Sequence, residues 1–158
     1  MTDERKKEFT LKISQAGPAG LTILLYEMTL EYLREAEQSY QKQDREAFRQ
    51  KIHLAQNCIR MQQKSLQMEY EPAKTLFSLY TFLHSHLAKA ITRFTIEQVQ
   101  ETKAILQKLH DAYQKAEKME QEEPLMTNTQ KVYAGLTYGR HALVENLTDG
   151  GAGRGFLV

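Results

Sequence analysis

The stretch from residue 18 to residue 33, PAGLTILLYEMTLEYL, places the strongest constraint on the fold of this chain. At the helical period of about 100° per residue, its apolar side chains form two stripes on opposite sides of one helix. One stripe holds Leu21, Leu24, Leu25, Met28 and Tyr32, and the other holds Ile23, Tyr26, Leu30 and Leu33. A surface helix of a globular protein needs only one apolar stripe. The second stripe must therefore meet a further layer, which is either another helix of the same chain or a partner.

Composition and charge exclude several classes of protein. The chain has 158 residues, which suits one domain with a core and leaves room for a tail. Lysine and arginine total 21 against 20 acidic residues, so the basic face of a nucleic-acid binder is not expected. No apolar run approaches the roughly 18 residues of a membrane helix, and the charged start MTDERKKEFTLK does not resemble a signal peptide. We therefore expect no nucleic-acid binding and no membrane insertion.

Cysteine usage bears on the compartment. Cys58 is the single cysteine of the chain, so no intramolecular disulfide can form. A chain of this kind is typical of a reducing setting. The sequence therefore predicts a cytoplasmic protein.

Helix-start signals divide the chain into segments. Pro18 and Pro72 suit first helical turns, Asp44 suits an N-cap, and Thr95 with Gln98 has the spacing of a capping box. We expect helices over 18–43, from 44 to about 66, from about 72 to 94, and from 95 to about 120–123. The short turns require neighbouring helices to run antiparallel. The predicted fold is all-α, an antiparallel up-down four-helix bundle over residues 18–123.

The two ends differ from the bundle. Residues 1–17 form an N-terminal arm, in which Phe9, Leu11 and Ile13 alternate with polar residues as in an extended segment. Residues 124–158 form a C-terminal tail with apolar residues, glycine breaks and a glycine-rich end, and this tail could add a short fifth helix.

Catalytic and metal-binding patterns are weak. His84 and His86 are two residues apart on a helix, so they diverge by about 200° and cannot hold one metal from a single face. Cys58 lies inside a helix with no histidine beside it, which favours an inert thiol. No pair of carboxylates is apparent. We therefore predict no enzymatic activity, no metal and no cofactor.

The second predicted helix also carries a second stripe. Its members are Leu54, Cys58, Met61, Ser65 and Met68. Methionine is flexible and polarizable, and it is frequent on surfaces that adapt to a partner. The same residues also suit the filling of gaps in a core, and the pattern alone leaves both interpretations open.

Two regions resemble the flagellar export chaperones of the FliS family. Residues 16–33 match the opening of their first helix through Pro18, Leu21, Leu25, Tyr26 and Glu27. A second region matches in order and spacing through Ser65, Leu66, Glu69, Glu71, Ala73, Leu76, Leu79 and Tyr80. The resemblance covers about residues 9–118. Gly17 stands where many relatives have serine, and Gly20 replaces a usual polar or acidic residue.

The resemblance implies a function. Such chaperones bind the disordered C-terminal segment of newly made flagellin in the cytosol, prevent early polymerisation and deliver it to the flagellar export gate protein, with no cofactor. The client would form helices in hydrophobic grooves, which gives the second stripes a role. The residues predicted to line the groove are Ile23, Tyr26, Leu30, Leu54, Cys58, Met61, Met68, Leu79 and Phe82.

An open groove would expose more apolar surface than soluble monomers usually tolerate. We therefore expect at least one end of the chain to cover it before the client arrives. The predicted lid residues are Phe9, Ile13, Val132, Tyr133 and Leu136. The tail is the favoured lid because it is longer, although a permanently packed or disordered tail remains an alternative.

Two other functions remain open. A structural bundle could self-associate through the second stripes, for instance as a homodimer. A histidine phosphotransfer domain is also a four-helix bundle, with His53 or His110 as its candidate histidine. Neither histidine is followed by the Lys-Gly pair typical of such domains, so this alternative is the weaker one.

Overall fold

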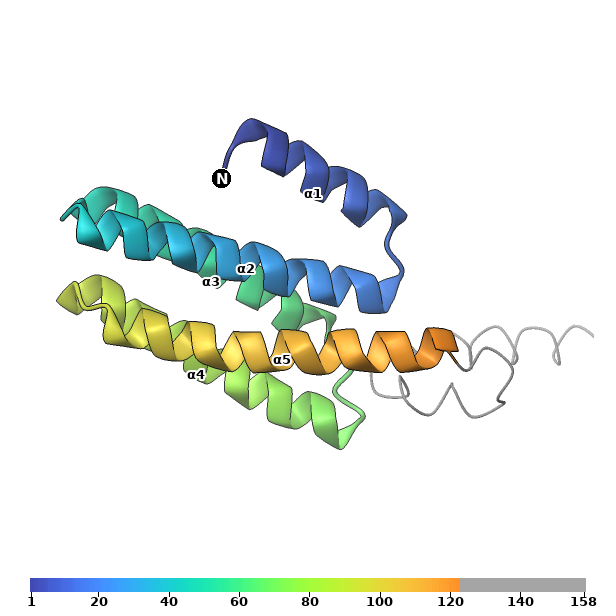
Figure 1. Ribbon diagram of the computed structural model, residues 1–158. Helices are drawn as coiled ribbons and strands as arrows, with labels where there is room; N and C mark the ends of the chain where they lie inside the picture. Colours follow the sequence, from blue (N-terminus) through green and yellow to red (C-terminus); the bar gives the residue numbers. More distant parts are fainter. Residues whose placement is uncertain (123–158) are drawn as a thin grey trace, which may run out of the picture.

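The computed structural model describes residues 1–122, and all its regular elements there are helices. They are α1 (Asp3–Gln15), α2 (Pro18–Gln41), α3 (Arg45–Ser65), α4 (Glu71–Arg93) and α5 (Glu97–Glu122) (Figure 1). The predicted all-α bundle is confirmed, with α2 to α5 as its four helices. The expected extra C-terminal helix falls outside the described residues.

The predicted starts of the first two bundle helices, α2 and α3, agree with the structure. Pro18 opens α2 directly after Gly17, and the Asp44 carboxylate accepts a hydrogen bond of 2.9 Å from the backbone N–H of Ala47 at the start of α3. Gln43 adopts a left-handed conformation with φ of 56°. This residue turns the chain, so α2 ends at Gln41 rather than at the predicted residue 43.

The connection between α4 and α5 differs from the predicted capping box. Phe94 ends α4 in the left-handed region, and its backbone N–H donates to the carbonyl of Ala90. Helix α5 begins at Glu97, two residues after Thr95. The Thr95 hydroxyl therefore donates to the side-chain carbonyl of Gln98 instead of capping the helix backbone.

Aromatic packing stabilises the end of the bundle where these two turns lie. The ring of Phe94 lies 4.9 Å from that of Tyr40 and 5.1 Å from that of Phe48, centroid to centroid. The guanidinium of Arg45 lies 4.5 Å from the centre of the Phe94 ring. These contacts offset the cost of the left-handed conformation of a bulky residue.

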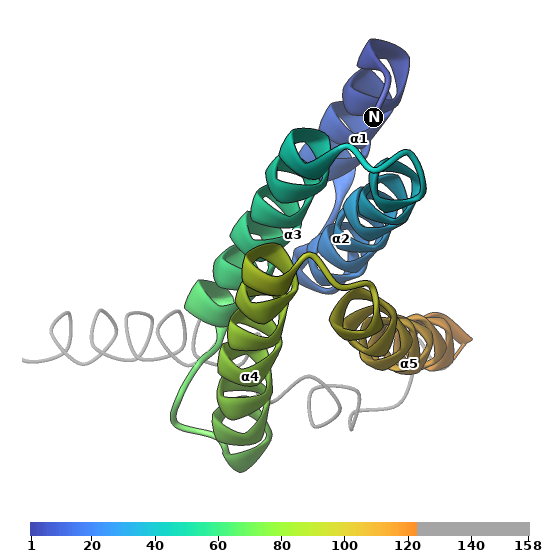
Figure 2. The same ribbon diagram turned by 90° about the vertical axis from the view of Figure 1, so that its left-hand side faces the viewer.

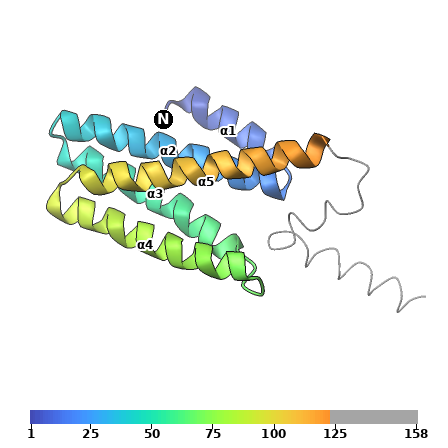
Figure 3. The same ribbon diagram turned by 60° about the horizontal axis from the view of Figure 1, so that its bottom comes forward.

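The helices follow an up-down order in space. Helix α2 packs on α3 and α5, and α4 packs on the other sides of α3 and α5. Helix α1 lies outside the bundle and packs on α2 (Figures 1 and 3). Figure 2 shows α4 and α5 running apart from the turn that joins them. The turns at 42–44 and 94–96 lie at one end of the bundle, and the other connections lie at the opposite end (Figure 1).

The core contains a buried chain of hydrogen bonds. The hydroxyls of Tyr26 and Tyr80 lie 2.5 Å apart, and Tyr80 donates to the side-chain oxygen of Gln62 at 2.9 Å. Because Tyr80 has one hydroxyl proton, Tyr26 is the donor of the first bond. Burial raises the pKa of both tyrosines, so both hydroxyls stay protonated. This chain joins α2, α3 and α4.

We expect Tyr80→Phe to lower the free energy of unfolding by about 1–3 kcal/mol. The substitution leaves Tyr26 and Gln62 buried without their partner. Urea unfolding followed by circular dichroism measures the change. Tyr40→Phe is the matched control, because no side-chain hydrogen bond of Tyr40 is present in residues 1–122. Equal stability of the two variants would contradict the role of the network.

Candidate functional site

Exposed apolar side chains mark the outer side of α3. Leu54 and Met61 are seven residues apart and exposed, with Met61 57% accessible to solvent. Met68, three residues beyond the end of α3, is also exposed. The opposite side of the helix buries the core residues Phe48, Ile52, Ala55 and Ile59. We call Leu54, Met61 and Met68 the α3 outer stripe.

The two apolar stripes of α2 differ in how they are buried. Tyr26, Leu30 and Leu33 lie in the core of the bundle. On the other side, Leu24 is buried and Leu21 is exposed. Residues 18–33 of α2 therefore bury one apolar stripe in the bundle core. The other apolar stripe is only partly covered, by a second layer outside the bundle, as a helix with two stripes requires.

This arrangement corrects part of the predicted groove. Ile23, Tyr26 and Leu30 were assigned to an open surface, but all three are buried. Cys58 is buried as well, beside the hydroxyl of Thr29, and burial raises the pKa of its thiol. Helical spacing does not state which face points inward, and it placed the buried Cys58 in one stripe with the exposed Leu54 and Met61.

Helix α1 supplies the partial second layer. Residues 3–15 are helical rather than extended, because the Thr2 hydroxyl caps the helix and Asp3 and Glu4 occupy its first turn. This corrects the predicted extended arm. Phe9 is 2% exposed and is the one buried residue of α1.

Ion pairs complete the contact between α1 and α2. The Nε of Arg5 lies 3.0 Å from a carboxylate oxygen of Glu31, and its guanidinium lies 4.6 Å from the centre of the Phe9 ring. The amino group of Met1 pairs with Glu35. Ile13, a predicted lid residue, is 37% exposed, so it is covered far less than Phe9. One buried aromatic side chain, the partly exposed pair of Arg5 with Glu31 and the largely buried pair of the Met1 amino group with Glu35 thus hold α1 in place. This contact is small compared with the bundle core.

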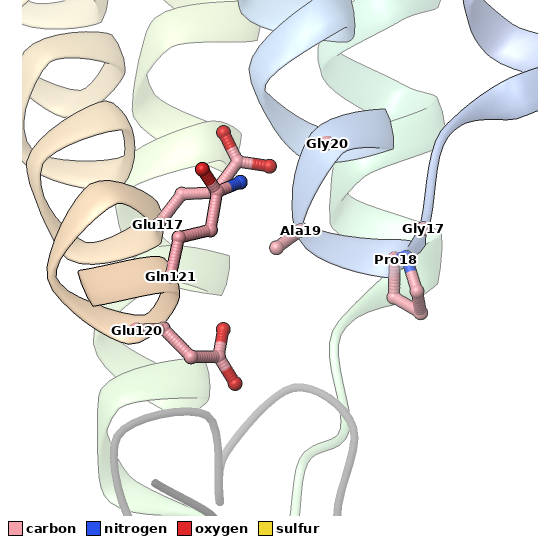
Figure 4. A pocket seen from close by; sticks show the side chains of 7 residues that line it. All are labelled: Gly17, Pro18, Ala19, Gly20, Glu117, Glu120 and Gln121. Atoms are coloured by element: carbon pink, nitrogen blue, oxygen red, sulfur yellow. The ribbon is translucent and has the colours of Figure 1, made fainter. Parts of the chain in front are cut away.

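A hollow lies where α1 joins α2. Its walls are Gly17, Pro18, Ala19, Gly20, Glu117, Glu120 and Gln121, and its volume is about 420 Å³. Figure 4 shows the three α5 side chains pointing towards the first turn of α2. A Cβ atom added at Gly20 would lie 3.3 Å from the Cβ of Ala16 and 3.5 Å from the Glu117 carboxylate. The missing side chain of Gly20 therefore allows Ala16 and Glu117 to approach α2 closely, whereas a Cβ atom at Gly17 would meet nothing within 4 Å.

Leu79 and Phe82 lie on another side of the molecule from the α3 outer stripe. The Phe82 ring stacks on His86, 5.0 Å between centroids, and His86 lies 2.5 Å from a carboxylate oxygen of Glu101 on α5. Leu79 is half-buried against the core. These two residues belong to the side of α4 that faces α5, so the predicted groove does not form one continuous surface.

The comparison with known protein families agrees with this architecture. The sequence model of the family described as "Flagellar protein FliS" matches residues 1–120. The chain belongs to the FliS family. The "Flagellar secretion chaperone FliS" of Bacillus subtilis (strain 168) is 24% identical over 104 residues, which cover 66% of this chain and 78% of the relative. The resemblance inferred from the sequence is thereby confirmed.

The histidines within residues 1–122 of this FliS-family chain lie close to polar groups. Arg60 contacts His84 at 3.1 Å, and His53 contacts Gln56 at 3.0 Å. His110, which is buried, lies 3.5 Å from a carboxylate oxygen of Glu27. Within residues 1–122, no three histidine, cysteine or acidic groups come together as metal ligands. None of the helices there is long and apolar enough to cross a membrane.

Sequence reasoning missed the contacts that position α1 in this FliS-family chain. Arg5 and Glu31 are 26 residues apart, and no short-range pattern indicates that they meet. The alternation of Phe9, Leu11 and Ile13 favoured an extended arm, whereas residues 3–15 are helical and Phe9 is the one buried residue of α1. The other predicted lid residues, Val132, Tyr133 and Leu136, lie outside the described residues.

Proposed function

We propose that this chain is a cytoplasmic flagellar secretion chaperone that binds the disordered C-terminal segment of flagellin. Binding would prevent premature polymerisation, and the complex would deliver flagellin to the flagellar export gate protein. One observation carries the proposal: a member of the FliS family holds exposed apolar side chains, the α3 outer stripe, on a helix whose other side is fully packed.

Helix-in-groove recognition fits this surface. An amphipathic client helix places apolar residues three, four and seven positions apart on one face, and Leu54 and Met61 are seven residues apart along α3, so both can contact such a face. A disordered client must also offset the entropy lost when it folds, so it needs a large apolar contact. The adaptable side chains of Met61 and Met68 suit such a contact. The proposal contains no catalytic step and no cofactor.

We further propose that α1 is a lid over the second apolar stripe of α2, and that this stripe extends the client-binding surface beyond the α3 outer stripe, which is exposed with α1 in place. Phe9 docks on α2, and the small contact of α1 with the bundle favours a segment that can be displaced. The open surroundings of Gly17, between α1 and α2, support the same interpretation, because they leave room for α1 to change its direction. A permanently docked α1 is the competing explanation.

Met61→Asp tests the proposed surface. The variant should keep the melting temperature of the wild type, because Met61 is exposed, and should bind a flagellin C-terminal segment about 10- to 100-fold more weakly. Isothermal titration calorimetry at several temperatures measures the affinity, and it should also show the negative heat-capacity change of apolar burial.

Met119→Asp on α5 is the matched control, since Met119 is also 57% exposed. The control should bind the segment as the wild type does. Failure of the folded wild type to bind flagellin would refute the proposed function. An unfolded Met61→Asp variant would show instead that Met61 belongs to the core.

A further inference from the structure

Helix α3 carries an excess of basic residues. The helix contains Arg45, Arg49, Lys51, Arg60 and Lys64, but only one acidic residue, Glu46. Arg49 pairs with Glu46, and Lys51 pairs with Glu35 on α2. Within residues 1–122, Arg60 and Lys64 have no carboxylate partner. A third cation of α3, Arg45, has no carboxylate partner there either and lies over the ring of Phe94, so two of the three unpaired cations lie in the second half of the helix.

These two cations lie beside the exposed methionine. Arg60 directly precedes Met61, and Lys64 follows Met61 by three residues, which places it on the neighbouring turn. Arg60 and Lys64 are four residues apart, so they lie one above the other along one edge of the α3 outer stripe. The stripe thus has an apolar centre and a basic edge.

A neutral partner fixes the position of Arg60. An Nη atom of Arg60 lies 3.1 Å from the Nε2 atom of His84 on α4. Burial, followed by the charge of Arg60, lowers the pKa of His84, so the imidazole accepts this hydrogen bond in its neutral form. The contact orders the guanidinium without neutralising it. The remaining N–H groups of Arg60 stay available for a carboxylate, and their ordering in advance reduces the entropy cost of binding.

We propose that Arg60 and Lys64 recognise acidic side chains on the flagellin segment, next to apolar residues that contact the α3 outer stripe. This inference rests on the proposed function. The client helix would carry aspartate or glutamate residues about one turn apart along one edge of its apolar face. Charge complementarity of this kind selects a partner and fixes its register.

A double charge reversal tests the inference. Arg60→Glu with Lys64→Glu should weaken binding of a purified flagellin C-terminal segment by about tenfold or more. It should also reduce the dependence of the affinity on salt concentration, because exposed charges are screened by salt. The same net charge change at Lys115→Glu with Lys118→Glu on α5 is the control, and it should alter the affinity less than twofold. Thermal unfolding of both variants confirms that each is folded.

The outcomes separate the inference from the proposed function. If the wild type binds flagellin and both double variants bind equally well or equally poorly, a specific role of Arg60 and Lys64 is excluded while the chaperone function stands. If the folded wild type does not bind flagellin at all, the proposed function fails, and this inference fails with it. Replacing the acidic residues of the segment by amides should reproduce the loss seen with the double reversal.

Discussion

Deleting residues 1–16 is expected to raise the affinity for the flagellin segment by about tenfold or more. If α1 covers part of the client surface, only the wild-type molecules in which α1 is undocked can bind the client. Each 1.4 kcal/mol of free energy that favours docked α1 then lowers the apparent affinity for the client about tenfold. The truncated chain begins at Gly17 and retains α2 to α5. Calorimetric titration of the same flagellin segment into the wild type and the truncated chain gives the ratio of their dissociation constants.

Phe9→Ala provides the control for this experiment. It removes the one buried side chain of α1 but keeps the helix in the chain, so it should reproduce most of the gain in affinity. Unfolding temperatures of both proteins should stay close to the wild-type value, since the main core cluster consists of residues from α2 to α5. Weaker binding after the deletion would show that α1 contacts the client rather than covers its site.

Leu33→Ala is expected to lower the free energy of unfolding by about 2–5 kcal/mol. Leu33 is fully buried in the core, and alanine leaves a cavity there that the neighbouring helices fill incompletely. Urea unfolding at constant temperature measures the loss. The slope of the free energy against urea concentration should not change, because the native fold is kept.

Leu54→Ala is the matched control, because it removes the same atoms from a side chain that is 38% exposed. Its stability should change by about 0.5 kcal/mol or less, while its affinity for the segment should fall. A large loss of stability in Leu54→Ala would place the α3 outer stripe in the core and contradict the proposed surface.

Local signals made the helices predictable from the sequence. Pro18 and Asp44 have a direct physical effect on the first turn, and the structure places helix starts at both positions. Short connections then leave an antiparallel order as the natural arrangement of α2 to α5. The helix end at Gln41 was less predictable, because a left-handed Gln43 carries no glycine signal.

The candidate site was predictable only in part, and α2 gives the reason. Its two stripes have similar apolar content, so the pattern does not state which one lies in the core. That choice depends on contacts such as the hydrogen bond of Tyr26 to Tyr80, 54 residues away. For the same reason Leu79 and Leu54 were placed on one groove, although they lie on different sides of the bundle.

The aromatic contacts of Phe94 have a mechanical consequence for the bundle. Phe94, Tyr40 and Phe48 tie three helices together at the end where the two tight turns lie, whereas α4 and α5 run apart towards the other end (Figure 2). We therefore expect an applied load to separate α4 from α5 first at the end away from Phe94, which is also the end where α1 joins the bundle. The aromatic contacts of Phe94 would stay in place during that separation.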